Sequence, residues 1–235
     1  MDKSPIVGKL SIISMRGCEE FTSRIDHYLK QFRKDYDDQD TYVTHITCPR
    51  FGTGEGKCVI EETVRGHDVY IICDMFNHGV TYKMYQQTNH MSPDDHYQDL
   101  KRIIAAMGGK PRRITVVMPM LYEGRQHRRT ARESLDCASA LQELISMGVT
   151  NIITFDAHDA RVQNAIPLHS FDDVQTTYQM IKALTKTVPD ISFDKEDTII
   201  ISPDEGGMNR CMYYSSVLEI DLGMFYKRRD YSVVV

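Results

Sequence analysis

The sequence lacks the features that mark a membrane protein, a secreted protein or a zinc protein. No apolar run approaches the roughly 20 residues that a transmembrane helix needs, and the first residues lack the apolar core of a signal peptide. The six cysteines are scattered without a Cys-x-x-Cys pair, which argues against a zinc site or a disulfide framework and favours a reducing cytoplasm. The formal net charge of −5 argues against a broad nucleic-acid surface, so any bound anion needs a local basic cluster.

Two widespread nucleotide-binding motifs are also missing. The sequence contains no Gly-x-x-x-x-Gly-Lys-Ser/Thr, which excludes a P-loop, and no Gly-x-Gly-x-x-Gly that would support a dinucleotide site. A content of 41% hydrophobic and 26% charged residues is nevertheless ordinary for a folded globular protein. Any nucleotide or phosphate site must therefore be built from other residues.

Short apolar runs alternate along the chain with longer stretches of helical periodicity. Several runs are almost entirely apolar, as expected for strands buried on both faces of a parallel sheet. The expected strands lie at residues 9–15, 42–48, 69–73, 114–118, 151–155, 198–201 and 224–226, and the expected helices at 18–36, 92–107, 130–147 and 173–187. This alternation predicts an α/β fold with a mainly parallel sheet.

We expect two domains, covering residues 1–160 and 161–235. A new cycle of helix, strand and helix begins near residue 164, and the last stretch of about 75 residues is too short for a complete second α/β domain. The chain stops on the apolar residues 231–235, whereas natural termini are more often polar and frayed. We therefore expect the chain to be part of a longer polypeptide.

Four polar clusters follow directly after expected strands, and ligands in open α/β sheets bind beyond the carboxyl ends of the strands. The first cluster, residues 122–132, holds four arginines within eight residues. It suits a polyanion clamp of guanidinium forks and helix N–H groups, with a solvated basic loop as the less favoured alternative. The second cluster, residues 155–159, places His158 among carboxylates and suits metal binding or proton transfer. A hydrogen-bonded structural histidine explains these residues equally well.

The third and fourth clusters lie nearer the end of the chain. Residues 202–207 combine Asp204 and Glu205 with two glycines and could hold a hard cation such as Mg²⁺, although an ordinary strand-to-helix turn also explains them. Residues 227–230 are basic and suit a developing phosphoryl charge, or equally a solvated edge. Together, the four clusters favour a magnesium–nucleotide or sugar-phosphate site at one edge of a sheet.

In this order, the motifs resemble those of the ribose-phosphate pyrophosphokinase family (phosphoribosyl diphosphate synthetases). The matching segments are Phe51–Glu55 with Thr63–Gly66, Gly124–Gln126, Phe155–His158, Ser202–Gly207 and Lys227–Arg229. The resemblance implies two phosphoribosyltransferase-like parallel-sheet domains, the second incomplete in this chain, in a cytoplasmic homo-oligomer. It also implies a reaction that transfers the β,γ-diphosphate of ATP to the 1-hydroxyl of ribose 5-phosphate, with AMP leaving.

The resemblance also assigns roles to residues of the nucleotide site. It implies that Phe51 and Glu55 hold the adenine of ATP bound by a neighbouring subunit, and that Arg125 and Gln126 contact ATP. His158 would lie at the magnesium–ATP site and act through water, because Mg²⁺ prefers oxygen ligands.

Three further residues receive roles in metal binding and transfer. Asp204 would share the magnesium–ATP site with His158, and Lys227 and Arg229 would stabilise the transition state. Such roles fit phosphoryl-type transfer, which depends mainly on positioning and on cationic stabilisation of charge.

The sequence departs from the family pattern at several points. Thr53 stands where the family usually has Asp or Asn, and His127 and Thr130 replace acidic residues often found in the Arg-Gln segment. The Asp-Asp-x-x-x-(Ser/Thr)-Gly loop that cradles ribose 5-phosphate is absent from the chain. We therefore expect nucleotide binding without complete catalysis unless the missing segment is supplied. The alternatives are a non-catalytic regulatory paralogue that assembles with active subunits, and a generic phosphate-binding module without adenine selectivity.

Overall fold

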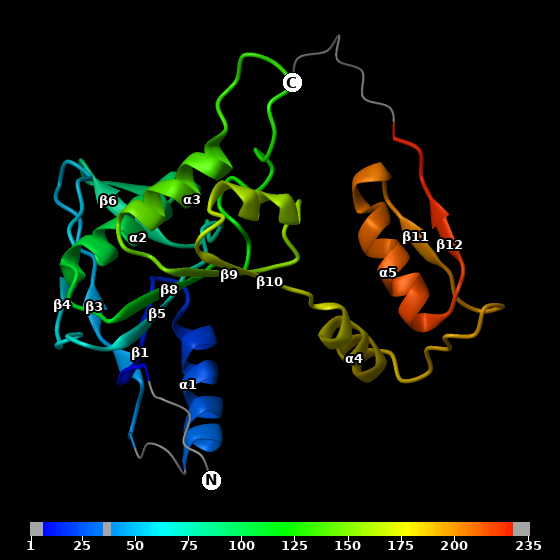
Figure 1. Cartoon of the computed structure of the whole chain (residues 1–235), viewed down its shortest axis with the longest axis horizontal. Helices are drawn as coiled ribbons and strands as arrows, with labels where there is room; N and C mark the ends of the chain where they lie inside the picture. The colour runs from blue at the N-terminus through cyan, green and yellow to red at the C-terminus, as the bar shows by residue number, and fades with distance from the viewer. Residues whose placement is uncertain (1–6, 35–38, 228–235) are drawn as a thin grey trace. The chain divides into compact units, whose positions relative to one another are not determined.

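The chain folds into two compact units that divide between Val174 and Gln175 (Figure 1). The structure is a computed structural model that describes residues 7–34 and 39–227. The first unit extends past residue 160, the boundary expected from the sequence, because β10 (Ser170–Val174) pairs with β9 (Asn151–Phe155) along its whole length. The assignment of two phosphoribosyltransferase-like domains divided at residue 160 stays a prediction.

A parallel sheet of six strands, in the order β10-β9-β8-β5-β1-β2, forms the centre of the first unit. The other strands of this sheet are β1 (Leu10–Ser14), β2 (Val43–Thr44), β5 (Asp68–Ile72) and β8 (Arg113–Val117). The central strands β1, β5 and β8 are mostly buried on both faces, which explains their nearly continuous apolar sequences. The expected α/β fold with a mainly parallel sheet is confirmed.

Helices cover the two faces of this sheet and create two apolar cores. α2 (Pro93–Met107) and α3 (Asp136–Ser146) lie on one face, and α1 (Glu19–Arg33) lies on the other (Figure 1). Leu100 and Ile103 of α2 pack with Val69 and Val116 of the sheet in the larger core. The smaller core joins residues of β1 and β5 to the apolar stripe of α1.

Two short hairpins and a 3₁₀ helix complete the first unit. β3 (Ile46–Thr47) pairs with β4 (Val59–Ile60), β6 (Thr81–Met84) pairs with β7 (Gln87–His90), and the 3₁₀ helix η1 covers Ala160–Ala165. The sequence predicts one strand over residues 42–48, but the chain leaves the sheet after β2 and begins the β3–β4 hairpin. The hairpin of β6 and β7 was not predicted.

The second unit contains a small parallel strand–helix–strand arrangement. α4 (Thr177–Thr187) comes first, followed by β11 (Ile200–Ser202), η2 (Glu205–Gly207), α5 (Met208–Leu218) and β12 (Leu222–Met224). β11 and β12 pair in parallel, and α5 forms the connection between them. Two parallel strands need such a crossover, because the chain must return to the level at which the first strand began before the second strand can run in the same direction.

The structure corrects two of the expected helix starts. α3 begins at Asp136 rather than at residue 130, because the Glu133 carboxylate accepts hydrogen bonds from the Thr130 and Ala131 N–H groups and holds that segment in a turn. The helix expected at residues 173–187 begins at Thr177, because residues 170–174 form the edge strand β10. No helix in the described ranges is long and apolar enough to cross a membrane.

The start of α2 follows the sequence signal closely. The Ser92 side chain accepts a hydrogen bond from Asp95 N–H at 3.1 Å, and Asp95 Oδ2 accepts one from Ser92 N–H at 3.0 Å. Replacing Ser92 by Ala removes one half of this reciprocal cap and is expected to lower the free energy of unfolding by about 0.5–2 kcal/mol, as measured by urea denaturation. Ser23→Ala, at an exposed position inside α1, is the matched control and is expected not to destabilise the chain. Equal losses in both variants would contradict the role of the cap.

Candidate functional site

The structure brings two of the predicted clusters together at the carboxyl ends of β8 and β9. His127, in the loop after β8, lies with its Nε2 3.5 Å from Asp159 Oδ2, in the loop after β9. The rings of His127 and His158 are also in contact, with centroids 5.0 Å apart. The prediction of one shared sheet edge is therefore confirmed for residues 122–132 and 155–159. It is wrong as a statement about all four clusters, because residues 202–207 and Lys227 follow the strands of a separate two-stranded sheet in the second unit.

The loop after β8 is attached to the start of α2. The Tyr122 hydroxyl donates a hydrogen bond to Asp94 Oδ1 at 2.6 Å, and the Tyr122 ring stacks on Tyr97 with centroids 4.4 Å apart. Glu123 has a φ of +54°, and burial is the largest cause of the raised pKa of its carboxyl group. These contacts fix the chain direction just before Arg125.

Arg125 and Gln126 differ in how they are held. The Gln126 side-chain amide donates to the Ser134 carbonyl oxygen at 3.3 Å. Arg125 is exposed, and no residue in the described ranges forms a hydrogen bond or ion pair with its guanidinium group. Arg125 is therefore available to an external anion, whereas Gln126 would have to exchange its present partner.

The arginines do not open a helix, in contrast to the sequence expectation. Residues 122–135 form turns and loops, and α3 begins only at Asp136. The N–H groups at the start of α3 therefore lie well after Arg125 in the sequence, and that of Cys137 already donates to the Gln126 carbonyl oxygen at 3.4 Å. What remains of the predicted polyanion clamp is the exposed guanidinium groups of Arg125, Arg128, Arg129 and Arg132.

The loop after β9 is held by an ion pair. Asp159 Oδ1 accepts hydrogen bonds from the Arg161 backbone N–H and from Arg161 Nε, both at 2.9 Å. The Arg161 side chain is the largest cause of the lowered pKa of Asp159, to which His127 also contributes. Asp159 is therefore a carboxylate at neutral pH, and it faces the His127 imidazole.

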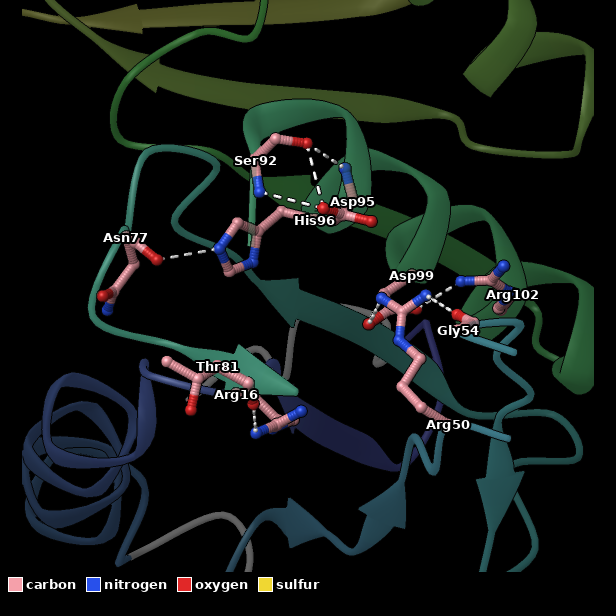
Figure 2. Close-up of polar contacts among 10 residues, drawn as sticks. All are labelled: Arg16, Arg50, Gly54, Asn77, Thr81, Ser92, Asp95, His96, Asp99 and Arg102. Atoms are coloured by element: carbon pink, nitrogen blue, oxygen red, sulfur yellow. Dashed lines mark hydrogen bonds and ion pairs between the residues drawn. The ribbon is translucent and has the colours of Figure 1, made fainter. Parts of the chain in front are cut away.

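Phe51 and Glu55 lie in the loop between β3 and β4, which a buried ion pair fixes to α2. Arg50 Nη2 contacts Asp99 Oδ2 at 2.9 Å, and the Arg50 and Asp99 side chains are only 6% and 4% exposed. Arg102 Nη1 contacts the other Asp99 oxygen at 2.6 Å. Arg50 also donates to the Gly54 carbonyl oxygen at 3.4 Å. Figure 2 shows the Arg50 guanidinium beside Asp99 and Gly54.

The same loop presents an aromatic ring to its surroundings. Phe51 is 55% exposed, and Lys57 Nζ lies 5.9 Å from the centre of its ring. The Phe51 N–H donates to the Glu55 carbonyl oxygen at 2.7 Å, which closes the turn. Thr53 Oγ1 donates to Glu55 Oε2 at 2.8 Å, so the residue that departs from the family pattern binds the Glu55 carboxylate.

In the second unit, Asp204 and Lys227 follow the carboxyl ends of the paired strands β11 and β12. Asp204 Oδ1 accepts a hydrogen bond from Gly207 N–H at 3.2 Å, and the Ser202 hydroxyl donates to the Asp204 carbonyl oxygen at 2.7 Å. The Phe225 N–H donates to the Ser202 carbonyl oxygen at 2.9 Å, which keeps the strand ends together. Lys227 is exposed, and Arg229 lies outside the described residues.

The described side chains do not form a complete metal cage. Over residues 7–34 and 39–227, no group of three or more His, Cys, Asp or Glu side chains is placed to hold a metal ion. Mg²⁺ commonly binds one or two carboxylates and takes its other ligands from substrate phosphates and water. A carboxylate such as Asp204 has the chemistry to bind such an ion directly, and His158 has the chemistry to contact one through water. The assignment of both residues to one magnesium site stays a prediction.

Sequence reasoning missed the loop after β1. A cavity of about 410 Å³ opens there and is lined by residues that include Arg16, Asp26, Thr44, Cys48, His96 and Asp99. Arg16 Nη2 donates to the Thr81 carbonyl oxygen at 2.7 Å, and His96 Nε2 donates to the Asn77 carbonyl oxygen at 3.0 Å (Figure 2).

The position of this cavity follows from the topology. From β1 the chain passes outward to β2, whereas β5 lies on the other side of β1, so the strand order reverses next to β1. The cavity opens beside this point, at the carboxyl ends of β1 and β2. Such points are preferred ligand sites in open α/β sheets. The available signal was Arg16 directly after the first expected strand, but one charge is a weaker signal than four arginines.

Comparison with known proteins is consistent with this architecture. A family model described as the N-terminal domain of ribose phosphate pyrophosphokinase matches residues 10–148. The chain is 28% identical over 197 residues to ribose-phosphate pyrophosphokinase of Maricaulis maris, covering 83% of this chain and 56% of that protein. It is 28% identical over 182 residues to ribose-phosphate pyrophosphokinase A of Dictyostelium discoideum, covering 77% and 51%.

A solved structure shows the same fold. The crystal structure of phosphoribosylpyrophosphate synthetase from Mycobacterium smegmatis matches with a TM-score of 0.75 at 20% identity, covering 94% of this chain and 65% of that chain. The chain spans about half the length of the curated relatives it matches. Relative to the solved structure, the second domain is partial in this chain.

The ion pair beneath the Phe51–Glu55 loop provides a test of how that loop is held. Asp99→Ala leaves the buried Arg50 guanidinium without its carboxylate and is expected to lower the free energy of unfolding by about 3–5 kcal/mol in urea denaturation. The matched control is Lys101→Ala on the same helix. Lys101 is 21% exposed and its partner Glu143 is 44% exposed, so a loss of about 0–1 kcal/mol is expected. Similar losses in the two variants would contradict the anchoring role of Asp99.

Proposed function

Because the chain belongs to the ribose phosphate pyrophosphokinase family, whose N-terminal domain matches more than half of it, we propose that it is the nucleotide-binding part of a ribose-phosphate diphosphokinase. The reaction transfers the β,γ-diphosphate of ATP to the 1-hydroxyl of ribose 5-phosphate. The 1-hydroxyl oxygen of ribose 5-phosphate attacks the β-phosphorus and loses its proton to solvent, the bond from that phosphorus to the oxygen that bridges it to the α-phosphorus breaks, and AMP leaves with that oxygen. The observation that carries the proposal is the His127 contact with His158 and Asp159, which places two of the family's motifs at one sheet edge.

Arg125 is the residue best suited to bind the ATP phosphates. Its guanidinium is exposed and engages no described partner, and a guanidinium fork matches two phosphate oxygens. Gln126 lies beside it and supplies an amide donor once it leaves Ser134. Positioning and cationic charge of this kind provide most of the catalysis in phosphoryl transfer.

Adenine would be bound by the loop between β3 and β4. The Phe51 ring offers a stacking surface, and the Glu55 carboxylate can accept a hydrogen bond from the exocyclic amine of adenine. By resemblance to the family, the Phe51–Glu55 loop would hold the adenine of ATP bound by a neighbouring subunit. A cytoplasmic homo-oligomer is therefore part of the proposal.

Magnesium would enter as the complex with ATP, where it neutralises phosphate charge. His158, through water, and Asp204, through a carboxylate oxygen, are the residues proposed to contact it. Lys227 and Arg229 are proposed to stabilise the charge that develops during transfer, which agrees with the exposure of Lys227 at the end of β12.

Calorimetric titration with magnesium–ATP, followed by an AMP-release assay with ribose 5-phosphate, tests this function. ATP binding without AMP release is the expected result and supports a nucleotide-binding part that needs further chain, or a non-catalytic regulatory paralogue. AMP release would contradict the expectation that catalysis needs a further segment. An absence of ATP binding to the assembled protein would contradict the assignment.

The phosphate contact of Arg125 can be measured directly. Arg125→Ala removes a charged hydrogen-bond donor worth about 1.5–3 kcal/mol and is expected to raise the Kd for magnesium–ATP about 10-fold or more in calorimetry. Arg112→Ala is the matched control, because Arg112 is an exposed arginine that precedes β8 and therefore lies at the opposite edge of the sheet. An unchanged Kd in Arg125→Ala, or an equal change in Arg112→Ala, would argue against the phosphate contact.

A test of the proposed contact between Phe51 and adenine distinguishes an ATP-binding enzyme from a generic phosphate-binding module. Phe51→Ala removes a stacking surface worth about 1–3 kcal/mol per base and is expected to weaken ATP binding roughly 5- to 150-fold while leaving inorganic phosphate binding unchanged. Phe32→Ala, at a 76% exposed position on α1, is the control and should leave ATP binding unchanged. If Phe51→Ala leaves ATP binding intact while Arg125→Ala weakens ATP and phosphate equally, a module without adenine selectivity is the better interpretation.

A further inference from the structure

Two cysteines face each other across the hairpin that carries the Phe51–Glu55 loop. In this hairpin Ile46 pairs with Ile60 and Thr47 pairs with Val59, and the register continues to a bridge between Arg50 and Gly56. The same antiparallel register places Cys48 directly opposite Cys58. Both cysteines are half-buried and, like Ile46 and Ile60, pack against the larger core, so the two thiols lie on one face of the hairpin.

The backbone hydrogen bonds identify the kind of pair. Lys57 N–H donates to the Pro49 carbonyl oxygen, and Glu61 N–H donates to the His45 carbonyl oxygen, both at 3.1 Å. Hydrogen-bonded and non-hydrogen-bonded positions alternate in an antiparallel ladder, so Cys48 and Cys58 occupy a non-hydrogen-bonded position. The Cα atoms of such pairs lie about 4.5 Å apart, which is within the range of about 4.4–6.8 Å that a disulfide accepts.

The two thiols are reduced but already in contact. A side-chain hydrogen bond between Cys48 and Cys58 lowers the pKa of Cys48 and raises that of Cys58. The Arg50 and Arg102 guanidinium groups also lower the pKa of Cys48, against the opposing effect of Asp99. Burial also raises the pKa of Cys48, so its thiolate is favoured by the partner thiol and by the two guanidinium groups.

Cys48 is also reachable from solvent, whereas Cys18, Cys73 and Cys137 are not. It lines the 410 Å³ cavity at the end of β1, which is large enough for a small oxidant. Cys18, Cys73 and Cys137 are buried in the cores, and burial is the largest cause of their raised pKa values. The pair of Cys48 and Cys58 therefore differs from those three cysteines in both geometry and access.

We propose that Cys48 and Cys58 form a reversible disulfide with hydrogen peroxide as oxidant, and that this bond fastens the two arms of the hairpin below the Phe51–Glu55 loop. The Cys48 thiolate attacks one peroxide oxygen, the O–O bond breaks, and the departing hydroxide takes a proton to become water. The resulting Cys48 sulfenic acid is attacked by the Cys58 sulfur, the S–O bond breaks, and a second water leaves with the Cys58 proton. The thiols lose two electrons, which the peroxide accepts.

The disulfide acts on the loop because it joins the two strands two residues before the Arg50–Gly56 bridge that leads into the turn. In the reduced chain, the Phe51–Glu55 hydrogen bond, the Arg50 contacts and the Met84 side chain against Gly54 hold this turn. A covalent link next to them removes the open states of the loop. Any effect of the disulfide on adenine binding rests on the proposed function. The formation of the disulfide and the protection of the loop from hydrogen exchange do not rest on it.

The experiment uses the full chain treated with hydrogen peroxide and then with dithiothreitol. Trypsin cleaves after Arg50 and after Lys57, so a disulfide appears in mass spectrometry as a linked pair of peptides that contain Cys48 and Cys58. The linked pair is expected in the oxidised monomeric chain and should disappear after reduction. Hydrogen exchange of residues 50–56 is expected to slow at least several-fold in the oxidised form and to recover on reduction.

Three variants make the test specific. Cys58→Ser should prevent the link and leave a Cys48 sulfenic acid that dimedone traps, and Cys48→Ser should give neither product. Cys211→Ser, which alters a half-buried cysteine of α5, is the control and should leave the link intact. The inference is overturned if the folded chain keeps both thiols reduced, if the link forms only between chains or after unfolding, or if exchange of residues 50–56 does not slow. None of these readouts requires ATP, so they stand apart from failure of the proposed function.

Discussion

The structure depends on the in-register parallel pairing of the strands in its central sheet. Ile72 of β5 pairs with Val117 of β8, and Val117 pairs with Ile153 of β9, so these three strands end almost level with one another. Every loop that follows a strand of this sheet therefore emerges at one edge. This single constraint brings His127 to Asp159 and His158, although neither loop contains a regular element at that point.

The second constraint is electrostatic, because the loops at this edge contain charges that must be neutralised where they are buried. Asp99 is 3% exposed and receives both Arg50 and Arg102. A buried carboxylate without such partners would be costly. Arg50 neutralises the buried Asp99 carboxylate and also fixes the loop that presents Phe51. The free-energy cost of burying a charge in α2 is therefore offset by an ion pair that also orders this loop. Asp159 and Arg161 repeat this arrangement at the end of β9, in a more exposed setting.

How much of the fold the sequence predicts depends on how strongly each element is patterned. β5, β8 and β9 are predicted because their apolar runs leave few alternatives, and α2 is predicted because Ser92 supplies a cap. The hairpin of β6 and β7 is mostly polar, and its turn places Tyr85 and Gln86 at positive φ without the glycine that usually marks such a turn. Its structure is therefore set by tertiary contacts rather than by local sequence.

The candidate site divides in the same way. The placement of Arg125 and His158 is predictable from strand ends, whereas the pairing of Arg50 with Asp99 joins distant segments and has no local signal.

His127 shows what the structure adds to a family pattern. It stands where acidic residues are often found, but an acidic side chain there would approach the Asp159 carboxylate, whose charge Arg161 already stabilises. An imidazole can instead donate to that carboxylate and pack against His158. The exchange of acid for histidine is therefore compensated within the site, and it preserves the contact between the loops after β8 and β9.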